Sequence, residues 1–266
     1  MGVRRERFAA RTERARALVF LAGIVLGTAA ILVLRVAPWE AGWWFAPTST
    51  PSSRGSLAGK LVVLDPGHGG IDGGAIGLGG EIVEDDTVLA IARYLRDYLQ
   101  GAGAYARLTR EGDYDLAGEG RGRRKERDMR VRAQIMNAPD VDLAVSIHLN
   151  SVLSPKWWGA QVFYGEDPPE SACLAWHVQR ALAEHLGTPR LPKKRDDLYL
   201  LRVARVPTIL IEAGFLSHPE EARLLLTPIH QRRIALAIYD GIARYAEGNE
   251  PCPPPSSVPA QGKFRD

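Results

Sequence analysis

The sequence predicts an α/β domain with a mainly parallel or mixed sheet that helices cover on both faces. Short apolar runs alternate along the chain with longer segments whose apolar residues have helical spacing, and this alternation is typical of such folds. Apolar residues make up 45% of the 266 residues, which is enough to build the core of one α/β domain.

The expected strands are short and largely apolar, as strands are in a sheet that is buried on both faces. Residues 61–64, with the sequence Leu-Val-Val-Leu, are the clearest example. Further strands are expected over residues 105–109, 143–147, 160–164, 199–203 and 208–211.

The expected helices are marked by an apolar stripe or by a proline near their first residue. One helix opens at Glu84, carries apolar residues at i, i+3, i+4, i+7 and i+11 from Val88, and ends near Gly101 and Gly103. Residues 111–125 are expected to form a loop. Other helices, two of which start near a proline, are expected over residues 129–137, 170–186, 219–225 and 228–246.

A basic and then apolar N-terminal segment predicts a membrane anchor. Residues 17–34 are an uncharged run of 18 residues, which as a helix would span roughly 27 Å, close to the hydrocarbon thickness of a bilayer. Six arginines precede this run and only Arg35 follows it closely, so the N-terminus is expected in the cytoplasm and the rest of the chain outside. A cleaved signal peptide is the alternative, but the run exceeds the usual apolar region of about 7–15 residues.

These features divide the chain into five parts. They are a basic cytoplasmic N-terminus (1–16), a transmembrane signal anchor (17–35), a linker (36–59), an α/β domain (60–247) and a proline-rich tail expected to be disordered (248–266). The net charge of +3 does not indicate a nucleic-acid partner. A monomer is the default expectation for the part outside the membrane.

The chain has two cysteines, Cys173 in an expected helix and Cys252 in the proline-rich tail. Two cysteines are too few for a disulfide scaffold, and there is no CxxC pair to indicate a structural zinc site. Cys173 is interpreted as a small buried apolar residue, and a bridge between the two cysteines stays an open alternative.

A histidine in a glycine-rich turn is the first candidate for a functional site. Residues 65–70, Asp-Pro-Gly-His-Gly-Gly, directly follow a strand, and ligands in α/β folds bind just outside the carboxyl ends of strands. No Gly-Lys-Ser/Thr follows, which argues against a phosphate-binding loop. His68 is therefore a candidate metal ligand, with a capping histidine as the alternative.

Three more candidates stand at the ends of expected elements. Glu84 lies in the first turn of a helix, where the helix dipole alone also favours an acidic residue. His148 ends an apolar strand, and a buried structural histidine is its alternative. Glu212 ends another apolar strand, where a carboxylate is costly unless it is paired, coordinated or functional; a salt bridge to a nearby arginine is its alternative.

Together, these four residues predict metal-assisted hydrolysis. Two imidazoles and one carboxylate, from His68, His148 and Glu84, are a ligand set for a catalytic zinc with an open position. Glu212 is the free carboxylate that such a site needs as a proton shuttle. Four other histidines lack a suitably spaced ligand partner and are not expected to bind metal: His177, His185, His218 and His230.

A basic run over residues 121–132 carries seven Lys or Arg side chains with Glu126 and Asp128 among them. A solvated helix face with local ion pairs is the default interpretation, and a patch that faces a glycan or a peptide is the alternative. Arg110 and Arg132 are candidates for holding substrate carboxylates or the glycan, and structural pairing is the favoured interpretation of both.

In order along the chain, the four segments resemble the zinc-dependent N-acetylmuramoyl-L-alanine amidases of the amidase-3 type. The resemblance covers roughly residues 60–246. It rests on Asp65-Pro-Gly-His-Gly-Gly, the Glu84 helix start, Ser146-Ile-His-Leu-Asn-Ser151 and Ile211-Glu-Ala-Gly-Phe-Leu-Ser217. Other pieces are similar to the germination-specific, CwlD-type branch: Ser154-Pro-Lys-Trp157, Gly159-Ala-Gln161, Leu198-Tyr-Leu-Leu201, the basic stretch and the N-terminal anchor. Ala213 departs from the family, which often has glycine there.

The resemblance implies a central sheet of about six strands and one zinc ion per chain, held by His68, Glu84 and His148, with Glu212 as the catalytic glutamate. The implied reaction is hydrolysis of the amide bond between N-acetylmuramic acid and L-alanine in peptidoglycan. In the germination-specific branch this reaction would act in the spore cortex, as a step toward muramic-δ-lactam, in the space between the forespore membranes. The need for an accessory protein stays open.

Three further residues are weaker candidates within the same interpretation. Asn150 and Arg132 are candidates for binding substrate, and Asp65 is a candidate for orienting His68 through its other ring nitrogen. A zinc-dependent stem-peptide peptidase would use the same ligand set and is the first alternative function. A non-catalytic wall-binding regulator is the second, but it predicts loss of a ligand or of the glutamate, and none is lost.

Overall fold

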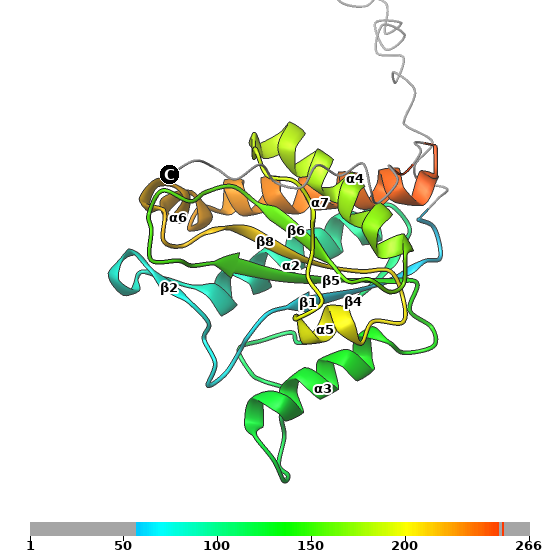
Figure 1. Ribbon diagram of the computed structural model, residues 1–266, viewed down its shortest axis with the longest axis horizontal. Helices are drawn as coiled ribbons and strands as arrows, with labels where there is room; N and C mark the ends of the chain where they lie inside the picture. The colour runs from blue at the N-terminus through cyan, green and yellow to red at the C-terminus, as the bar shows by residue number, and fades with distance from the viewer. Residues whose placement is uncertain (1–56, 250–251, 253–266) are drawn as a thin grey trace, which may run out of the picture. The chain divides into compact units, whose positions relative to one another are not determined.

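The computed structural model describes residues 57–249 and Cys252, which are built around a six-stranded sheet (Figure 1). The strand order is β4-β1-β5-β8-β6-β7. Neighbouring strands are parallel except β6 and β8, which are antiparallel. The strands are β1 (Leu61–Pro66), β4 (Tyr105–Leu108), β5 (Leu143–Asn150), β6 (Gln161–Tyr164), β7 (Lys193–Lys194) and β8 (Thr208–Phe215). The expected mixed α/β sheet of about six strands is confirmed.

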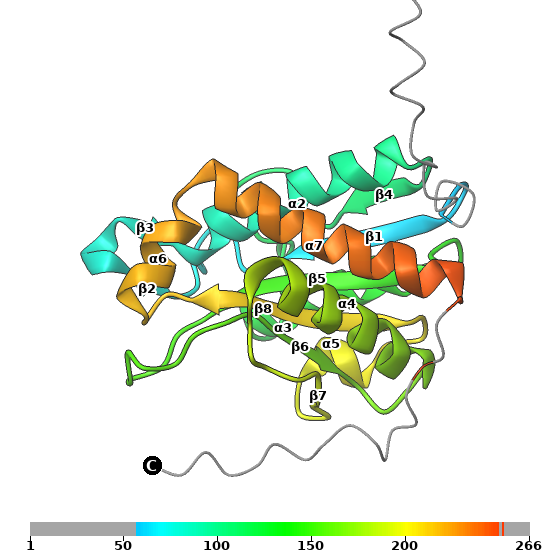
Figure 2. The same cartoon turned by 90° about the horizontal axis from the view of Figure 1, so that it is seen from above.

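Helices cover both faces of this sheet (Figures 1 and 2). On one face α7 (Pro228–Glu247) lies between α2 (Glu84–Gly101) and α4 (Glu170–Leu186). The other face carries α3 (Arg124–Met136) and the single-turn helix α5 (Tyr199–Arg202). The remaining elements lie outside the six-stranded sheet. They are α6 (Pro219–Leu225), η3 (Leu78–Gly80) and a separate two-stranded ribbon of β2 (Ile76–Gly77) and β3 (Ile82–Val83).

Successive side chains along each strand point to opposite faces of the sheet, so they pack into separate cores on its two faces. Val62 and Leu64 of β1 pack in the large core beneath α2, α4 and α7, whereas Val63 packs with Ala133 and Met136 of α3. All three β1 residues have no exposed surface. Burial on both sides explains why these strands are continuously apolar rather than alternating.

The expected strand over residues 199–203 is wrong, because these residues form α5. Its aromatic and apolar residues favour a strand when they are considered alone. In the structure Leu200 packs into the core beneath α3, and the adjacent Leu201 packs against Phe163 and Leu210. Consecutive residues can both face the sheet from one turn of helix, whereas on a strand they would point to opposite sides.

Two strands and one helix are longer than expected. β5 runs to Asn150 and β8 to Phe215, so His148 and Glu212 lie within strands rather than directly after them. α3 begins at Arg124, inside the segment expected to be a loop. The sheet therefore holds the candidate side chains on rigid backbone.

The expected membrane anchor over residues 17–35 lies outside the described residues, as do most of the linker and nearly all of the tail. Among the helices of residues 57–249, none is both long and apolar enough to cross a membrane.

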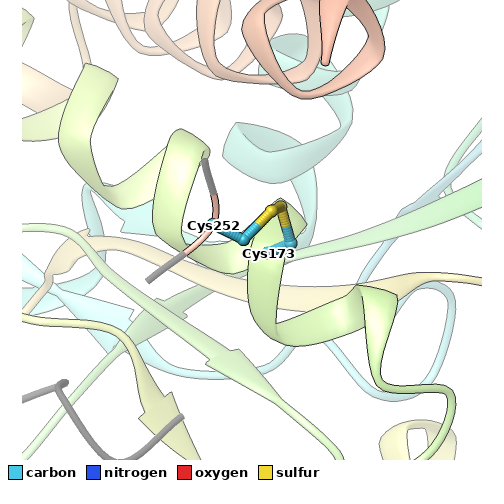
Figure 3. Close-up of a disulfide and its surroundings, with 2 residues drawn as sticks. All are labelled: Cys173 and Cys252. Carbon is cyan, nitrogen blue, oxygen red and sulfur yellow. A yellow bond between two sulfur atoms is a disulfide. The ribbon is translucent and has the colours of Figure 1, made fainter. Parts of the chain in front are cut away.

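The two cysteines form a disulfide, which resolves the alternative that the sequence left open (Figure 3). Cys173 lies on α4, and Cys252 follows the end of α7. The interpretation of Cys173 as a buried apolar residue is wrong, because its sulfur is bonded to an exposed residue. The bond attaches the segment after α7 to the helix beside it.

Candidate active site

The candidate residues meet at the carboxyl ends of the central strands. His148 on β5 pairs in register with Glu212 on β8, and Glu212 pairs with Gln161 on β6. Residues directly opposite each other on neighbouring strands project from the same face. His148, Glu212 and Gln161 therefore form a row on the face that also carries α3 and α5.

Gly67 makes room for the imidazole of His148. A Cβ atom added at Gly67 would lie 2.2 Å from Cε1 of His148 and 2.5 Å from its Nδ1. Such distances are far inside van der Waals contact. The first glycine of the turn after β1 is therefore required by the histidine on the neighbouring strand.

His68, Glu84 and His148 converge on one point. Nε2 of His68 lies 3.2 Å and Nδ1 of His148 lies 3.0 Å from the same oxygen, Oε1 of Glu84. The ligand atoms of all three residues lie within 4.8 Å of one another. Two imidazoles and a carboxylate in this arrangement fit a zinc ion with an open coordination position.

Backbone amides hold the Glu84 carboxylate in place. The N–H of Leu149 donates to Oε1 at 3.0 Å, and the N–H of Ala75 donates to Oε2 at 2.9 Å. Glu84 is also the first residue of α2, where the helix dipole favours negative charge. Burial alone would raise the pKa of Glu84, but its hydrogen bonds with His148 and His68 and the charges of both rings outweigh burial and lower it well below its usual range. The group is therefore ionised, as a metal ligand must be.

His68 is held in an unusual backbone conformation by the turn around it. Its φ of 60° is the one positive value among the non-glycine residues that the structure describes, a conformation that costs free energy and persists where surrounding contacts impose it. Nδ1 of His68 lies 3.0 Å from Oδ1 of Asp72. This contact leaves Nε2 directed at Glu84.

Asp72, rather than Asp65, therefore orients the ring of His68, and the prediction for Asp65 is wrong. Asp65 is fully buried and accepts hydrogen bonds from Thr109, Ser146 and Arg132. It lies on β1 three residues before His68, and its oxygens face the helix α3 side of the sheet. Its role is to anchor a buried arginine.

Arg132 is not placed to bind substrate. Its side chain is 2% exposed, and its guanidinium donates to Asp65, Asp128 and the carbonyl oxygens of Pro66 and His68. Arg132 thus holds the backbone of the turn that carries His68. The alternative of structural pairing is the one that the contacts support.

Arg110 has a similar position on the other side of the turn. It is 1% exposed and donates to the carbonyl oxygens of Pro66, Gly67 and Asp85. Two buried arginines thus hold the carbonyl groups of one glycine-rich segment. The exposed part of the basic run is engaged in ion pairs, among them Arg124 with Asp115 and Lys125 with Asp72, in line with its default interpretation.

Glu212 differs from every other acidic group of the site because one of its oxygens has no partner. Its Oε2 is buried and accepts no hydrogen bond from the described residues. Burial raises the pKa of Glu212, and the positive charge of a nearby histidine only partly opposes this effect. An unsatisfied buried carboxylate is costly for folding and is characteristic of a group kept for proton transfer.

Asn150 ends β5, two residues after His148, and its carbonyl oxygen accepts the N–H of Leu216. Its side chain stays a candidate for contacting substrate. Sequence reasoning missed Asp72 as part of the site, and it placed Gly67 in the glycine-rich turn without its role of making room for His148. The spacing of Asp72 at four residues after His68 was the available signal, but only the folded turn brings the two side chains together.

Three side chains that could hold a metal ion, beside a glutamate with an unpaired oxygen at the carboxyl ends of parallel strands, are typical of the site of a hydrolase on an α/β domain. Comparison with known proteins gives the particular family. Residues 62–244 match the Amidase_3 family model, described as N-acetylmuramoyl-L-alanine amidase. The chain belongs to this family and is an N-acetylmuramoyl-L-alanine amidase of peptidoglycan.

Individual relatives agree with this assignment. The germination-specific N-acetylmuramoyl-L-alanine amidase of Bacillus subtilis is 46% identical over 193 residues, which cover 71% of this chain and 81% of the relative. The amidase AmiA of Escherichia coli is 31% identical, with 74% and 80% coverage. Among solved structures, the CwlD amidase of Clostridioides difficile in complex with the GerS lipoprotein has 37% identity and a TM-score of 0.68, covering 71% of this chain and 100% of that one.

Proposed function

We propose that this amidase depends on one zinc ion held by His68, Glu84 and His148, with Glu212 as its catalytic residue. The observation that carries the proposal is the convergence of two ring nitrogens on Oε1 of Glu84, next to a glutamate whose buried oxygen has no partner. The substrate bond joins the lactyl carbonyl of N-acetylmuramic acid to the nitrogen of L-alanine.

Glu212 moves the proton in this proposal. The carboxylate of Glu212 accepts a proton from the water that attacks the carbonyl, and the carboxylic acid then donates that proton to the departing amine of L-alanine. The raised pKa of Glu212 suits both steps, because a carboxyl group with a pKa nearer neutrality is a better base and still a sufficient acid. When zinc is bound, it supplies a Lewis acid for the carbonyl and lowers the pKa of water.

The other residues of the site keep its parts in place. Asp72 holds the ring of His68, and the amides of Leu149 and Ala75 hold the carboxylate of Glu84. Asn150, at the end of β5, is proposed to contact the substrate beside the scissile bond. These contacts fix the active groups before substrate arrives, which removes the cost of arranging them during the reaction.

The proposed setting is the spore cortex. The similarity to a germination-specific amidase supports cleavage of cortex stem peptides as a step toward muramic-δ-lactam. Residues 60–247 would be the extracytoplasmic catalytic domain, joined by a linker (36–59) to an anchor (17–35). Because the C. difficile relative forms a complex with a lipoprotein, an accessory lipoprotein is proposed for this chain as well.

Digestion of purified peptidoglycan tests the reaction and its metal. The full-length chain is incubated with cortex and with vegetative peptidoglycan, with and without a zinc chelator, and the products are identified by mass spectrometry. The proposal predicts intact stem peptides that begin with L-alanine, their loss with chelator and their return with added zinc. Activity that persists after the metal has been removed would contradict the zinc dependence, and cleavage inside the stem peptide would favour the peptidase alternative.

A further inference from the structure

Arg190 lies in an aromatic sandwich at the edge of the site. Its guanidinium carbon is 4.5 Å from the ring centre of Phe215 and 5.7 Å from that of Trp157. Its Nε donates to the carbonyl oxygen of Trp158 at 2.7 Å, and its Nη1 donates to Oε1 of Gln161 at 3.3 Å. The residue belongs to the connection from α4 to β7, which passes the start of β6 in Figure 2.

This position is one strand away from the proposed catalytic residue. Gln161, which accepts the hydrogen bond from Arg190, is the direct register partner of Glu212. Phe215, on which the guanidinium stacks, follows Glu212 by three residues on β8. Because neighbouring strands lie about 4.8 Å apart, Gln161 is one strand spacing from Glu212, and Arg190 contacts Gln161 from the β6 side of the site.

Arg190 differs from the other cations of its segment in having no acidic partner. Lys194 pairs with Glu166 and Asp196, and Arg195 pairs with Asp197. Among the described residues, no carboxylate lies within ion-pair distance of Arg190. The nearest acidic influence on it is Glu221, whose carboxylate already accepts the amides of Gly159 and Phe215.

A half-buried guanidinium without a counter-ion is a site for an anionic ligand. Guanidinium groups bind carboxylates through paired N–H donors, and stacking on aromatic rings orders the group beforehand. In Arg190 one terminal nitrogen, Nη2, has no hydrogen-bond acceptor among the described residues, and Nη1 has only the long contact to Gln161. Arg190 thus has N–H donors without an acceptor, and its side chain contacts Gln161, the register partner of Glu212.

We propose that Arg190 binds the free carboxylate of the residue that follows L-alanine in the stem peptide. This inference rests on the amidase reaction, since it places the peptide side of the scissile bond toward β6 and β7. The glycan side of the substrate is uncharged when its amino sugars are N-acetylated, whereas the stem peptide is acidic. The first carboxylate after L-alanine is the charged group of the stem peptide closest along the chain to the scissile bond, and Arg190 contacts the register partner of Glu212.

The test compares two synthetic muropeptides that differ in one group. In one, the second residue has a free carboxylate, and in the other this carboxylate is an amide. The full-length chain is compared with Arg190→Gln, Arg190→Lys and the control Arg205→Gln, which changes an exposed arginine before the opposite end of β8. Thermal unfolding of each variant shows whether it is folded.

For Arg190→Gln, kcat/KM on the free-acid substrate is expected to fall by about tenfold or more, mostly through KM, since a hydrogen bond to a charged group is lost. On the amidated substrate the same variant is expected to change by less than about threefold. Arg190→Lys keeps the charge without the planar donors and is expected to lie between these results. Arg205→Gln is expected to match the wild-type chain on both substrates.

An equal loss on both substrates would overturn the proposal and make Arg190 a packing residue of the Trp157 and Phe215 cluster. An unchanged KM for the free acid would overturn it as well. Cleavage of both substrates by the wild-type chain reports the amidase reaction independently of Arg190. A failure of the reaction itself is therefore distinguishable from a failure of this inference.

Discussion

Gly67 and Glu212 contribute to the site through what they lack. Gly67 has no side chain, and the ring of His148 occupies the space that a Cβ atom would take. Glu212 has a buried oxygen with no hydrogen-bond donor. Both features are unfavourable or neutral for stability, so their value lies in the chemistry of the site.

Gly67→Ala tests whether the ring of His148 needs the space that the missing side chain of residue 67 leaves. The added Cβ would lie 2.2 Å from the His148 ring, so the ring must move and zinc affinity is expected to fall by about tenfold or more, with activity reduced at least about 100-fold. Zinc content by mass spectrometry and amidase assays measure both. Gly101→Ala is the matched control, because nothing lies within 4 Å of a Cβ atom there, and it is expected to keep zinc and activity. Normal zinc binding by Gly67→Ala would show that the ring of His148 can move without loss of the metal.

Glu212→Gln separates metal binding from proton transfer. The amide keeps the shape of the side chain but cannot accept the proton, so zinc content is expected to stay at the wild-type value while turnover falls by about 10²–10⁴-fold. Metal analysis and steady-state kinetics on the same preparation provide the comparison. Near-normal activity of this variant would assign the proton transfer to another group.

Asp65 contributes to the stability of the domain at neutral pH and to its sensitivity to acid. Burial raises the pKa of Asp65, but the charge of Arg132 and hydrogen bonds from Thr109, Ser146 and Arg132 outweigh burial, and the net pKa lies below the usual value. A carboxyl group with a lowered folded-state pKa stabilises the fold above its unfolded-state pKa of about 3.9 and loses this contribution as the pH falls through the folded-state value.

Asp65→Asn is therefore expected to destabilise the chain at pH 7 and to flatten its loss of stability below about pH 4. The destabilisation is expected to be about 3–5 kcal/mol, because Arg132 is left as a buried charge with one partner fewer. Denaturant unfolding at several pH values measures both effects. Asp140→Asn, at an exposed pair with Arg107, is the control and should change the acid dependence much less, because solvent screens an exposed pair. An Asp65→Asn curve parallel to the wild-type curve would rule out this source of acid sensitivity.

At the scale of elements, α3 holds the turn that carries His68, whereas α4 packs against α7 and carries the disulfide. From α3, Arg132 holds the carbonyl oxygens of Pro66 and His68. On the opposite face, α4 packs along α7 and carries Cys173, which is bonded to Cys252 beyond the end of α7. The disulfide therefore lies on the face of the sheet opposite α3 and opposite the row of His148, Glu212 and Gln161.

Cys252→Ser is expected to lower stability without changing the chemistry. The bond closes a loop with a sequence separation of 79 residues, for which the chain-entropy relation gives about 4 kcal/mol as an upper range. Thermal unfolding with and without a reductant should show a reductant-sensitive midpoint in the wild-type chain and an insensitive, lower midpoint in the variant. Initial rates at 25 °C should be equal. A lower rate for folded Cys252→Ser would connect the tail to the active site.

For the whole molecule, the proposed metal site would couple metal binding to folding, because its three residues come from distant parts of the chain. His68 follows β1, Glu84 opens α2, and His148 lies on β5. A ligand that binds only the folded chain raises its stability by an amount set by its concentration relative to Kd.

Chelation of zinc is thus expected to lower the melting temperature as well as to stop activity. Zinc at 100 times its Kd would stabilise the chain by about 2.7 kcal/mol, which corresponds to a shift of roughly 5–10 °C for a domain of this size. Calorimetry with chelator and with restored zinc measures the shift. Glu212→Gln should show the same shift, and His148→Ala should show a much smaller one. Equal shifts for all three chains would place the metal elsewhere.

The fold and the set of candidate metal ligands were predictable because they leave local patterns. Apolar runs marked most strands. His68 follows a strand, Glu84 opens a helix, and His148 lies near the end of a strand. The contacts of Asp72 and Arg190, and the role of Gly67 in making room for His148, were not predictable, since they depend on contacts across the turn or between strands. For Arg132 the sequence left both substrate binding and structural pairing open, because a basic run indicates exposure on average, but this member of the run points into the core.

The order of strands also determines how the sheet ends. Its margins are β4, which is four residues long and includes Arg107, and β7, which consists of two lysines. Short, cationic margins offer few free backbone groups for pairing with another sheet. The long apolar strands β5 and β8 would favour aggregation if they lay at an edge of the sheet. Both strands are paired with a neighbour on each side. An enzyme built this way can stay dispersed at high local concentration while it works along an insoluble polymer.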